Sequence, residues 1–296
     1  MEIFVTGATG FVGRELVHHL LQQGHTVRAL VRTAEAALPE RVETVLGDAT
    51  EYHRLAGAAE GCEAIINLVG IIREFPRRGI TFEKLHTETT RNLVRLAHDC
   101  HIRRFVQMSA NGTRDQAHSA YHQSKRAAEL LVIESDLDWT IFRPSLIYGP
   151  RDQFVNMLAQ QIKMLPVVPV LGDGSYRMQP VFVKEVVHSF ASCLERPECL
   201  RQVYHCCGTR TLSYDELLDE IGRALDKKTP VRKFHQPLVL MRPLIKVLQH
   251  LPWFPVTSEQ LIMLLEENIC SEADHWRTEF ALADDDFSAH IGSYLQ

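Results

Sequence analysis

Short apolar runs and longer amphipathic segments alternate along the first half of the chain. The apolar runs have the length of strands, and we predict strands at Ile3–Val5, Thr26–Val31, Val42–Leu46, Ala64–Leu68, Phe105–Met108 and Trp139–Phe142. Helix-period patterns lie between them, at Gly13–Gln23, Tyr52–Ala59, Phe82–Asp99 and Tyr121–Ser135. This alternation predicts βαβ units, and therefore an α/β fold with a doubly wound parallel sheet covered by helices on both faces.

The pattern changes after Arg143-Pro144. We predict helices at Phe154–Leu165, Val186–Leu194 and Ser213–Leu225, and strands at Val167–Leu171, Met178–Val183 and Val203–His205, with a turn at Gly172-Asp173-Gly174. Ser213 and Glu216 have the spacing of a capping box. The last part of the chain is helical and interrupted by prolines. We therefore expect a first domain over residues 1–150 and a mixed region over 151–296, which partly returns to the first sheet and otherwise forms a smaller helical lobe.

A glycine-rich turn, Thr6-Gly7-Ala8-Thr9-Gly10-Phe11-Val12-Gly13, joins the first strand to the first helix. Its glycines are spaced as G-x-x-G-x-x-G. Glycine lets the backbone approach a ligand, and a helix N-terminus offers free N–H groups and the positive end of the helix dipole. Glycines also mark ordinary turns, but between a strand and a helix this turn predicts the pyrophosphate-binding site of a Rossmann-type domain.

Arg32 ends the second predicted strand, 19 residues past Gly13. An acid at this place would hold the ribose 2′-hydroxyl of NAD, whereas an arginine accommodates a 2′-phosphate. We therefore expect NADP(H) as the preferred cofactor and NAD(H) as the alternative, with Arg28 as a further candidate on the same strand. Asp48 follows the third strand, where its carboxylate either accepts the adenine amino group or caps a turn.

Tyr121 and Lys125 form a Y-x-x-x-K pattern at the start of a predicted helix, and this spacing places both side chains on one face. A free tyrosine has a pKa of about 10, which is too high for a base at neutral pH. A neighbouring ammonium favours the phenolate and lowers that pKa. We therefore expect Lys125 to activate Tyr121 and to hydrogen-bond the nicotinamide ribose.

Together these motifs resemble the short-chain dehydrogenase/reductase superfamily in its extended or atypical form. The resemblance rests on Thr6–Gly13, Asp48, Asn67–Gly70, Tyr121 with Lys125, and Arg143-Pro144. A narrower resemblance is to the family of the NADPH-binding accessory subunit of respiratory complex I and its bacterial relatives. It is carried by Asn67–Ile71, Phe105–Ala110, Arg143-Pro144-Ser145, Gln179–Val183 and Leu251-Pro252…Thr257.

The resemblance implies a Rossmann core, tightly held NADP(H) and, for many members, no established substrate. It also implies the residues of the cofactor site: Gly7, Thr9, Gly10, Phe11, Val12, Gly13, Arg32, Asp48, Leu68, Val69, Gly70, Lys125, Pro144 and Ile147.

Two positions near the expected nicotinamide site depart from the pattern of active extended members. Ala110 occupies the place of the catalytic serine or threonine, and Ser109 lies one position earlier. Ser109 either orients a substrate carbonyl or caps the strand end, and Ser119 is an alternative. His86 stands where a relay asparagine is expected, and it either relays protons at neutral pH or is an ordinary helix residue.

A third departure concerns the substrate. Met178 occupies the place of an arginine that binds substrate phosphate in sugar-nucleotide enzymes, and Arg177 lies one residue early, which weakens a nucleotide-sugar assignment. Arg73, Arg77 and Arg78 follow the fourth strand, where they either meet an anionic substrate or form a solvated loop.

Other polar clusters carry less chemistry. His98 and His101, and the pair Cys206-Cys207, lack the spacing of zinc ligands, so we expect no metal. Asp284–Asp286 is interpreted as a solvated acidic turn. Arg242, Lys246 and His250 recur at intervals of four in the apolar segment 237–251, which either closes over the substrate or lies on a membrane surface or a partner.

The composition of the chain indicates which partners and which cellular compartment to expect. A net charge of −5 with interspersed signs argues against a nucleic-acid partner, and no apolar run approaches the ~20 residues that span a bilayer. Seven cysteines without a C-x-x-C motif predict reduced thiols, and a strand that starts at residue 2 leaves no room for a leader. We expect a cytoplasmic protein, with peripheral association with a membrane as an alternative. A homodimer that forms through the helices at 82–99 and 121–135 is a further possibility that the sequence does not decide.

We interpret the sequence as that of an NADP(H)-dependent oxidoreductase acting on an unidentified small molecule. Tyr121 would move the proton, Lys125 would tune Tyr121 and hold the ribose, and Ser109 or Ser119 would orient the carbonyl. A second hypothesis is a non-catalytic NADPH-binding protein that supports or assembles a membrane redox complex. A third is an epimerase or dehydratase of sugar nucleotides.

Overall fold

The computed structural model describes residues 1–227, 230–249, 251, 254, 256–270, 273–284 and 286–295. The chain divides into two compact units. The first comprises Met1–Pro144 and Val183–His205, and the second comprises Ser145–Phe182 and Cys206–Gln296. The first unit therefore takes back a segment from beyond residue 150.

All six strands predicted in the first half of the chain join one sheet of the first unit, with the order β11-β6-β5-β4-β1-β2-β3. The strands are β1 (Glu2–Thr6), β2 (Thr26–Val31), β3 (Glu43–Leu46), β4 (Ala64–Asn67), β5 (Arg104–Met108), β6 (Asp138–Pro144) and β11 (Gln202–Cys206). Each neighbouring pair from β6 to β3 is parallel. The strand order reverses at β1, so the crevice between the carboxyl ends of β1 and β4 is where such a sheet binds ligands.

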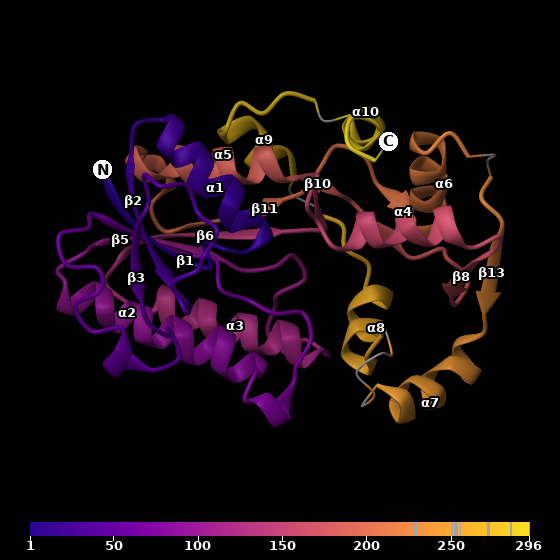
Figure 1. Cartoon of the computed structure of the whole chain (residues 1–296), viewed down its shortest axis with the longest axis horizontal. Coiled ribbons are helices and arrows are strands. Elements are labelled where there is room, and N and C mark those ends of the chain that lie inside the picture. Colours follow the sequence, from indigo (N-terminus) through magenta and orange to yellow (C-terminus); the bar gives the residue numbers. More distant parts are fainter. Residues whose placement is uncertain are drawn as a thin grey trace. The chain divides into compact units, whose positions relative to one another are not determined.

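Helices cover both faces of this sheet, which confirms the predicted doubly wound fold. Helices α1 (Phe11–Gln22) and α5 (Val183–Ser192) pack together on one face, and α2 (Thr89–Asp99) and α3 (Ala120–Ile133) lie on the other (Figure 1). The core under α2 and α3 is built from fully buried apolar side chains, among them Phe4, Ile65, Leu93, Leu96, Phe105, Val132 and Ile141. Short 3-10 turns occur at Tyr52–Arg54, Pro76–Arg78, Cys193–Glu195 and Pro197–Cys199.

Two predicted helices differ from those observed. The helix predicted at Tyr52–Ala59 is only the 3-10 turn Tyr52–Arg54, and Gly57 follows in a left-handed conformation that an α-helix does not contain. The helix predicted at Phe82–Asp99 begins with a π-helical segment, Glu83–Glu88, before α2. There the Thr89 hydroxyl donates a hydrogen bond to the carbonyl of Lys84, five residues back, which suits the wider turn.

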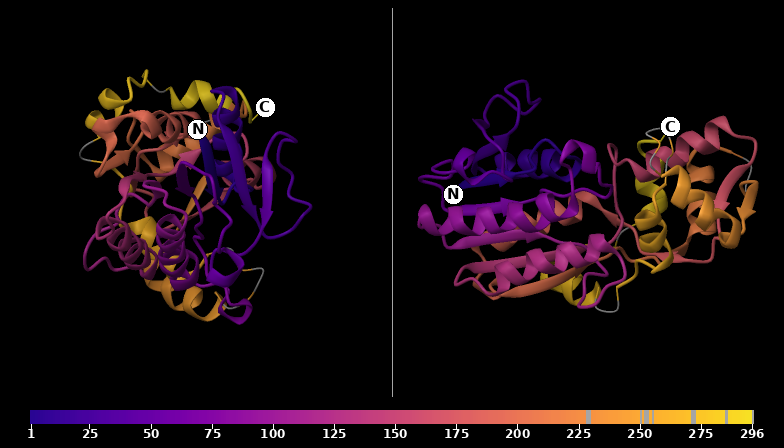
Figure 2. Two further views of the ribbon diagram at one scale, coloured as in Figure 1. Left: turned by 90° about the vertical axis from the view of Figure 1, so that its left-hand side faces the viewer. Right: turned by 90° about the horizontal axis from the view of Figure 1, so that it is seen from below.

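In its described residues, the second unit has three two-stranded pairings and six helices, seen in two further views in Figure 2. Its strands are β7 (Ile147–Tyr148) with β10 (Val181–Phe182), β8 (Val168–Leu171) with β13 (Lys233–Gln236), and β9 (Arg177–Met178) with β12 (Leu212–Ser213). Its helices are α4 (Phe154–Met164), α6 (Tyr214–Ala224), α7 (Leu238–Leu248), α8 (Ser258–Leu265), α9 (Ala273–Glu279) and α10 (Phe287–Gly292). Apolar residues of α4, α6, α10 and β8 form its core. Within the described ranges, no helix is long and apolar enough to cross a membrane.

Two predictions for the second unit rest on neighbouring residues alone, and one of them is confirmed. The capping box of Ser213 and Glu216 is confirmed at the start of α6. The strand predicted at Met178–Val183 is instead split into β9 and β10, because Pro180 has no N–H to donate to a ladder. His250, Pro252 and Asp285, which belong to predicted motifs, lie outside the described residues.

Cys207 and Cys270 form a disulfide across 63 residues, so the prediction that all cysteines are reduced is wrong for this pair. A side chain shared between the two segments brings them together: the Gln179 amide donates to the carbonyl of Gly208 and accepts from the N–H of Cys270. No spacing rule reveals such a pairing, because it arises from tertiary contacts. All seven cysteines are described, and the remaining five are free thiols: Cys62, Cys100, Cys193, Cys199 and Cys206.

The disulfide predicts a defined thiol count. In denaturant without reductant, five thiols should react with a chromogenic thiol reagent, and seven should react after reduction. The variant Cys270→Ser should show six thiols under both conditions. Seven reactive thiols in the unreduced wild type would mean that the bond does not form in solution.

Candidate cofactor and active site

The glycine-rich turn lies against the backbone that follows β4. Gly7 has a φ of 76°, and a Cβ there would lie 2.8 Å from the carbonyl carbon of Leu68. A Cβ on Gly13 would lie 2.1 Å from the carbonyl oxygen of Gly7, so neither position accepts a side chain. Among the described residues, no side chain caps the start of α1, and no acid lies in its first turn. The first-turn N–H groups therefore remain available to an anion such as a pyrophosphate.

Asn67, at the end of β4, ties together the carboxyl ends of three strands. Its amide oxygen accepts hydrogen bonds from the Thr6 hydroxyl at 2.8 Å and from the N–H of Val69 at 3.1 Å. Its amide nitrogen donates to the side-chain oxygen of Gln107 on β5 at 3.0 Å. No sequence motif predicts a role for this side chain, although its place as a polar residue at the end of a buried apolar strand is a signal.

Beside the turn lies a cavity of about 520 Å³. It is lined by Thr9, Arg14, Val31, Arg32, Thr33, Glu35, Ala36 and Ala37. Within the described part of the chain, the Arg32 guanidinium makes no hydrogen bond or ion pair, and its charge lowers the pKa of Asp48. Arg14 donates to the carbonyl of Thr9 at 3.0 Å and so is held at the same cavity. Arg14 is absent from the residues predicted for this site, although a basic residue directly after Gly13 is a signal in the sequence.

Arg28 does not serve this cavity, so its suggested assistance to Arg32 is wrong. Its guanidinium pairs with Glu2 at 2.6 Å and with Glu43 at 3.0 Å, and it donates to the carbonyl of Glu60 at 2.6 Å. These contacts join the N-terminal ends of neighbouring strands. Arg28 is therefore a structural residue.

Asp48 caps the turn that follows β3, which is one of its two predicted roles. One carboxylate oxygen accepts hydrogen bonds from the N–H and the hydroxyl of Thr50, at 2.9 and 2.8 Å. Burial by itself would raise the pKa of Asp48, but these hydrogen bonds and the nearby Arg32 outweigh it and lower the pKa. A charged carboxylate therefore lies close to the predicted adenosine side of the site.

The Tyr121 side chain is packed among aromatic rings at the start of α3. The rings of Phe82, His86 and His122 lie edge-on to it, with centroids 5.7, 5.4 and 5.2 Å away. Burial raises the pKa of Tyr121 to about 12, so the expectation that Lys125 lowers it is wrong for this structure. The Tyr121 hydroxyl is therefore protonated at neutral pH.

Lys125 lies one turn further along α3 and is 3% exposed. Its ammonium donates to the carbonyl of Met108, at the end of β5, at 3.3 Å. Burial lowers the pKa of Lys125 to about 8, although Glu129 partly opposes the shift. A Cβ on Gly70 would lie 3.0 Å from the Lys125 Nζ. The fold thus brings Tyr121 and Lys125 to the carboxyl ends of β4 and β5, beside the loop that carries Gly70.

His86 is locked in place as a neutral ring. Its Nε2 accepts from the N–H of Ile71 at 3.1 Å, so the proton is on Nδ1, which donates to the Ser124 hydroxyl at 2.8 Å. Ser124 in turn donates to the carbonyl of Tyr121 at 2.8 Å. Burial, and then the charge of Lys125, lower the pKa of His86 to about 2. The interpretation of His86 as a relay that titrates near neutral pH is therefore wrong, and its contacts are those of a positioning residue.

The two candidate serines have different surroundings. Ser119 is the N-cap of α3 and accepts from the N–H of His122, so its hydroxyl is engaged in the helix. Ser109 is buried, and its hydroxyl donates to that of Thr113 at 3.4 Å. The Ser109 N–H donates to the carbonyl of Phe142, which continues the pairing of β5 with β6.

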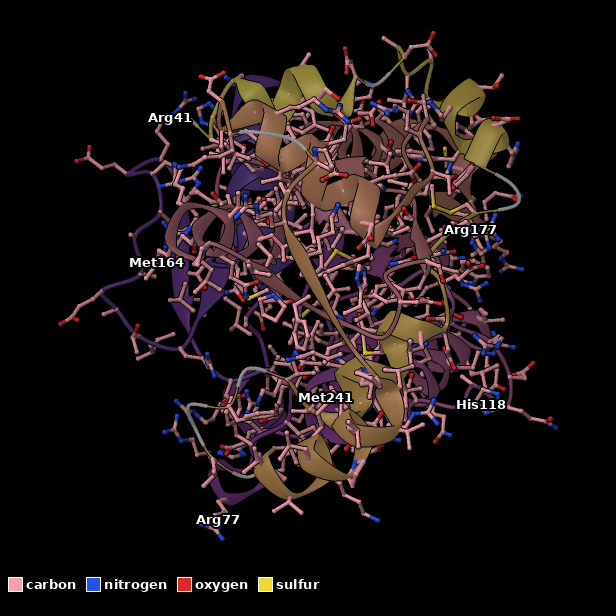
Figure 3. All side chains as sticks on the ribbon, turned by 90° about the vertical axis from the view of Figure 1, so that its right-hand side faces the viewer. Arg41, Arg77, His118, Met164, Arg177 and Met241 are labelled. Carbon is pink, nitrogen blue, oxygen red and sulfur yellow. A yellow bond between two sulfur atoms is a disulfide. The ribbon has the colours of Figure 1, made fainter. Side chains whose placement is uncertain are left out.

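The remaining predicted residues lie in several places. Pro144 ends β6 in the first unit, and its carbonyl accepts from the N–H of Asn111. In the second unit, Ile147 pairs with Val181, and Met178 is buried in the core. Among the exposed cations, Arg41 and Arg77 project from the ribbon, whereas Arg177 forms a two-pronged ion pair with Glu267, both contacts at 2.9 Å (Figure 3).

Known proteins share these features. Residues 7–161 match a family model described as NAD(P)H-binding. A ceramide reductase of Caulobacter vibrioides is 33% identical over 66% of this chain and 61% of its own length. The mitochondrial NADH dehydrogenase [ubiquinone] 1 alpha subcomplex subunit 9 of Arabidopsis thaliana is 29% identical over 64% of this chain and 49% of its own. The chain thus spans about half to three-fifths of the length of these relatives.

The fold has close matches among solved structures. The UDP-glucose 4-epimerase of Thermotoga maritima, solved with UDP-glucose, superposes with a TM-score of 0.76 over 100% of this chain and 97% of its own, at 16% identity. This match shows a shared fold. Together the comparisons confirm the predicted resemblance to extended short-chain dehydrogenases and to complex I accessory subunits.

The buried lysine predicts a pH dependence of stability. Burial lowers the pKa of Lys125 to about 8 in the folded protein, whereas its ordinary value of 10.5 applies to the unfolded chain. Between pH 8 and pH 10.5 the unfolded chain therefore binds more protons than the folded protein. The free energy of unfolding of the wild type, relative to Lys125→Met, should therefore rise from pH 8 towards pH 10, by roughly 2 kcal/mol. Urea titrations at pH 7, 8.5 and 10 measure the difference. The control is Lys84→Met, at an exposed lysine, for which the difference in unfolding free energy from wild type should not change with pH. A difference for Lys125→Met that is also independent of pH would contradict the prediction.

Proposed function

Because the chain belongs to the family of NAD(P)H-binding proteins, we propose that it is an NADP(H)-dependent reductase that acts on a carbonyl group. The observation that carries the proposal is the pair of Tyr121 and Lys125, a protonated tyrosine and a buried lysine in the same unit as the glycine-rich turn. The reductase name of the Caulobacter vibrioides relative supports this direction of reaction.

In this proposal, different residues of the site bind the cofactor, donate the proton and hold the proton donor in place. When bound, the nicotinamide supplies the hydride. Tyr121 donates its hydroxyl proton to the substrate oxygen, and the Lys125 ammonium would hydrogen-bond the nicotinamide ribose. His86 and Ser124 hold the backbone of Tyr121 in place. The high pKa of Tyr121 disfavours alcohol oxidation, because that direction requires Tyr121 to lose its proton first.

The cofactor fits the turn and the neighbouring cavity. The first-turn N–H groups of α1 would bind the pyrophosphate, and Arg32 and Arg14 would bind a 2′-phosphate in the 520 Å³ cavity. Glu35 lines the same cavity and opposes a second negative charge, but the two arginines outnumber it. We therefore assign NADP(H) as the preferred cofactor.

A second candidate function is a non-catalytic NADPH-binding component of a membrane redox complex. It is favoured by Ala110, which occupies the place of the catalytic hydroxyl, and by the similarity to a complex I subunit. An epimerase or dehydratase of sugar nucleotides is less well supported. Arg177 is paired with Glu267 rather than available for a substrate phosphate, and Met178 is buried.

Replacing Arg32 tests the cofactor assignment. Arg32→Asp should weaken NADPH binding by at least tenfold and leave NADH binding unchanged or stronger, because the variant exchanges a phosphate-binding cation for an anion. Titration of nicotinamide fluorescence measures both affinities. Arg41→Asp changes an exposed arginine outside the cavity lining and should leave the preference as in wild type. Equal losses for NADPH and NADH in Arg32→Asp would refute the role of Arg32.

Removing one hydroxyl tests the reaction. Tyr121→Phe should lower kcat for carbonyl reduction by at least 100-fold and leave the Kd of NADPH within about twofold, because only proton donation is lost. The control Tyr52→Phe removes a tyrosine hydroxyl that bonds Asp99 on the surface and should keep full activity. The assay is NADPH oxidation with a panel of ketones, aldehydes and quinones. Tight NADPH binding without oxidation by any of them would favour the second candidate function.

A further inference from the structure

Helix α7 of the second unit turns apolar side chains to solvent. Val239 is 84% exposed, Val247 71%, Leu240 67% and Leu244 45%. Ile245 is the only buried residue of the helix, all of which the structure describes. Met241, labelled in Figure 3, marks its position. An amphipathic helix of a water-soluble unit shows the opposite arrangement, so this exposed face calls for a partner.

The exposed apolar residues form one stripe. At 100° per residue, Val239, Val247, Leu240 and Leu244 fall within less than half of the helix circumference. The side chain of Ile245 lies on the opposite side, where the helix packs on the protein. Phe234 of β13, just before the helix, is also 60% exposed. The stripe of exposed residues therefore runs from Val239 to Val247, along most of α7.

Cationic residues flank this stripe. Arg242 and Lys246, one turn apart, are both exposed on the edge next to Val239. The surrounding sequence is strongly biased: the segment 227–258 contains six lysines and arginines and no acid. All 37 aspartates and glutamates lie elsewhere, with the other 26 of the 32 lysines and arginines. The sequence around α7 is thus rich in positive charge within an acidic chain; Lys233 is paired with Asp219 at 2.7 Å, so Arg242 and Lys246 are the cations that flank the stripe.

We propose that α7 docks on the surface of an anionic phospholipid bilayer. The stripe of Val239, Leu240, Leu244 and Val247 would enter the boundary between headgroups and acyl chains, with the helix axis parallel to the membrane. Arg242 and Lys246 would lie at the level of the lipid phosphates, with their alkyl stems along the apolar surface. The inference does not depend on the catalytic proposal for Tyr121.

A bilayer fits this surface better than a second copy of the chain. In a two-fold contact the same patch would face itself, so the cationic segments of both copies would be brought together without an acid in either. An anionic membrane satisfies the apolar stripe and the cationic edge at once. The helix is too short to span the bilayer, so binding would be peripheral.

Vesicle co-sedimentation tests the proposal with the full chain. The probe is large vesicles of phosphatidylcholine with about one-third phosphatidylglycerol, compared with vesicles of phosphatidylcholine alone. The wild type should sediment with the anionic vesicles, and binding should fall with added salt. Arg242→Gln with Lys246→Gln should lower the partition coefficient about 25-fold, about fivefold for each cationic residue. Val239→Ser with Val247→Ser should lower it at least tenfold without any change of charge.

A control matched in charge separates site from net charge. Arg41→Gln with Arg91→Gln removes two exposed arginines of the first unit and should leave vesicle binding within about twofold of wild type. An equal loss in this control would overturn the assignment to α7, as would equal binding of the wild type to both kinds of vesicle or binding to neither. A dimer in analytical ultracentrifugation that Val239→Ser with Val247→Ser converts to a monomer would overturn it in favour of self-association.

Discussion

The buried hydrogen-bond cluster around Asn67 is the constraint on which the candidate site depends. It joins Thr6 at the end of β1, Gln107 on β5 and the backbone after β4. With these three strand ends held together, the turn at Gly7 passes within van der Waals contact of the β4 loop, and only glycine fits there. The same convergence places Gly70 beside the ammonium of Lys125. One buried amide thus positions both the glycine-rich turn and the side chains that we propose for proton transfer.

Burial then decides the chemistry of these side chains. A spacing of four predicts only that Tyr121 and Lys125 share a helix face. Their packing against Phe82, His86 and the end of β5 removes water, which raises the pKa of Tyr121 and lowers that of Lys125. Desolvation disfavours the charged form of each group, so a protonated tyrosine is the resting state.

The two units use their surfaces differently. The first unit engages many of its charges internally, as Arg28 with Glu2 and Glu43 shows. In the second unit, α7 leaves both its cations and its apolar side chains in water. An exposed apolar stripe raises the free energy of the isolated protein, so its persistence in a folded unit points to a surface that covers it.

The sequence by itself determined the elements whose cause is local. Strand and helix periods predicted the sheet, the glycine spacing predicted the turn at β1, and Ser213 with Glu216 predicted the start of α6. These features depend on side-chain alternation, allowed φ values and a cap three residues away, all of which neighbouring residues define. The predictions of elements that were wrong also had local causes. Gly57 limits the predicted helix to a short turn at Tyr52, and Pro180 interrupts a predicted strand.

Only the tertiary structure decided the properties that depend on contacts between distant segments. The neutral state of His86 requires its burial and the nearby charge of Lys125, and its orientation requires Ile71 and Ser124 on either side of the ring. The engagement of Arg28 requires acids from two other strands. The disulfide of Cys207 with Cys270 requires segments 63 residues apart to meet. Desolvation, ion pairing and covalent cross-linking all depend on distances in space, and neither composition nor spacing along the chain encodes those distances.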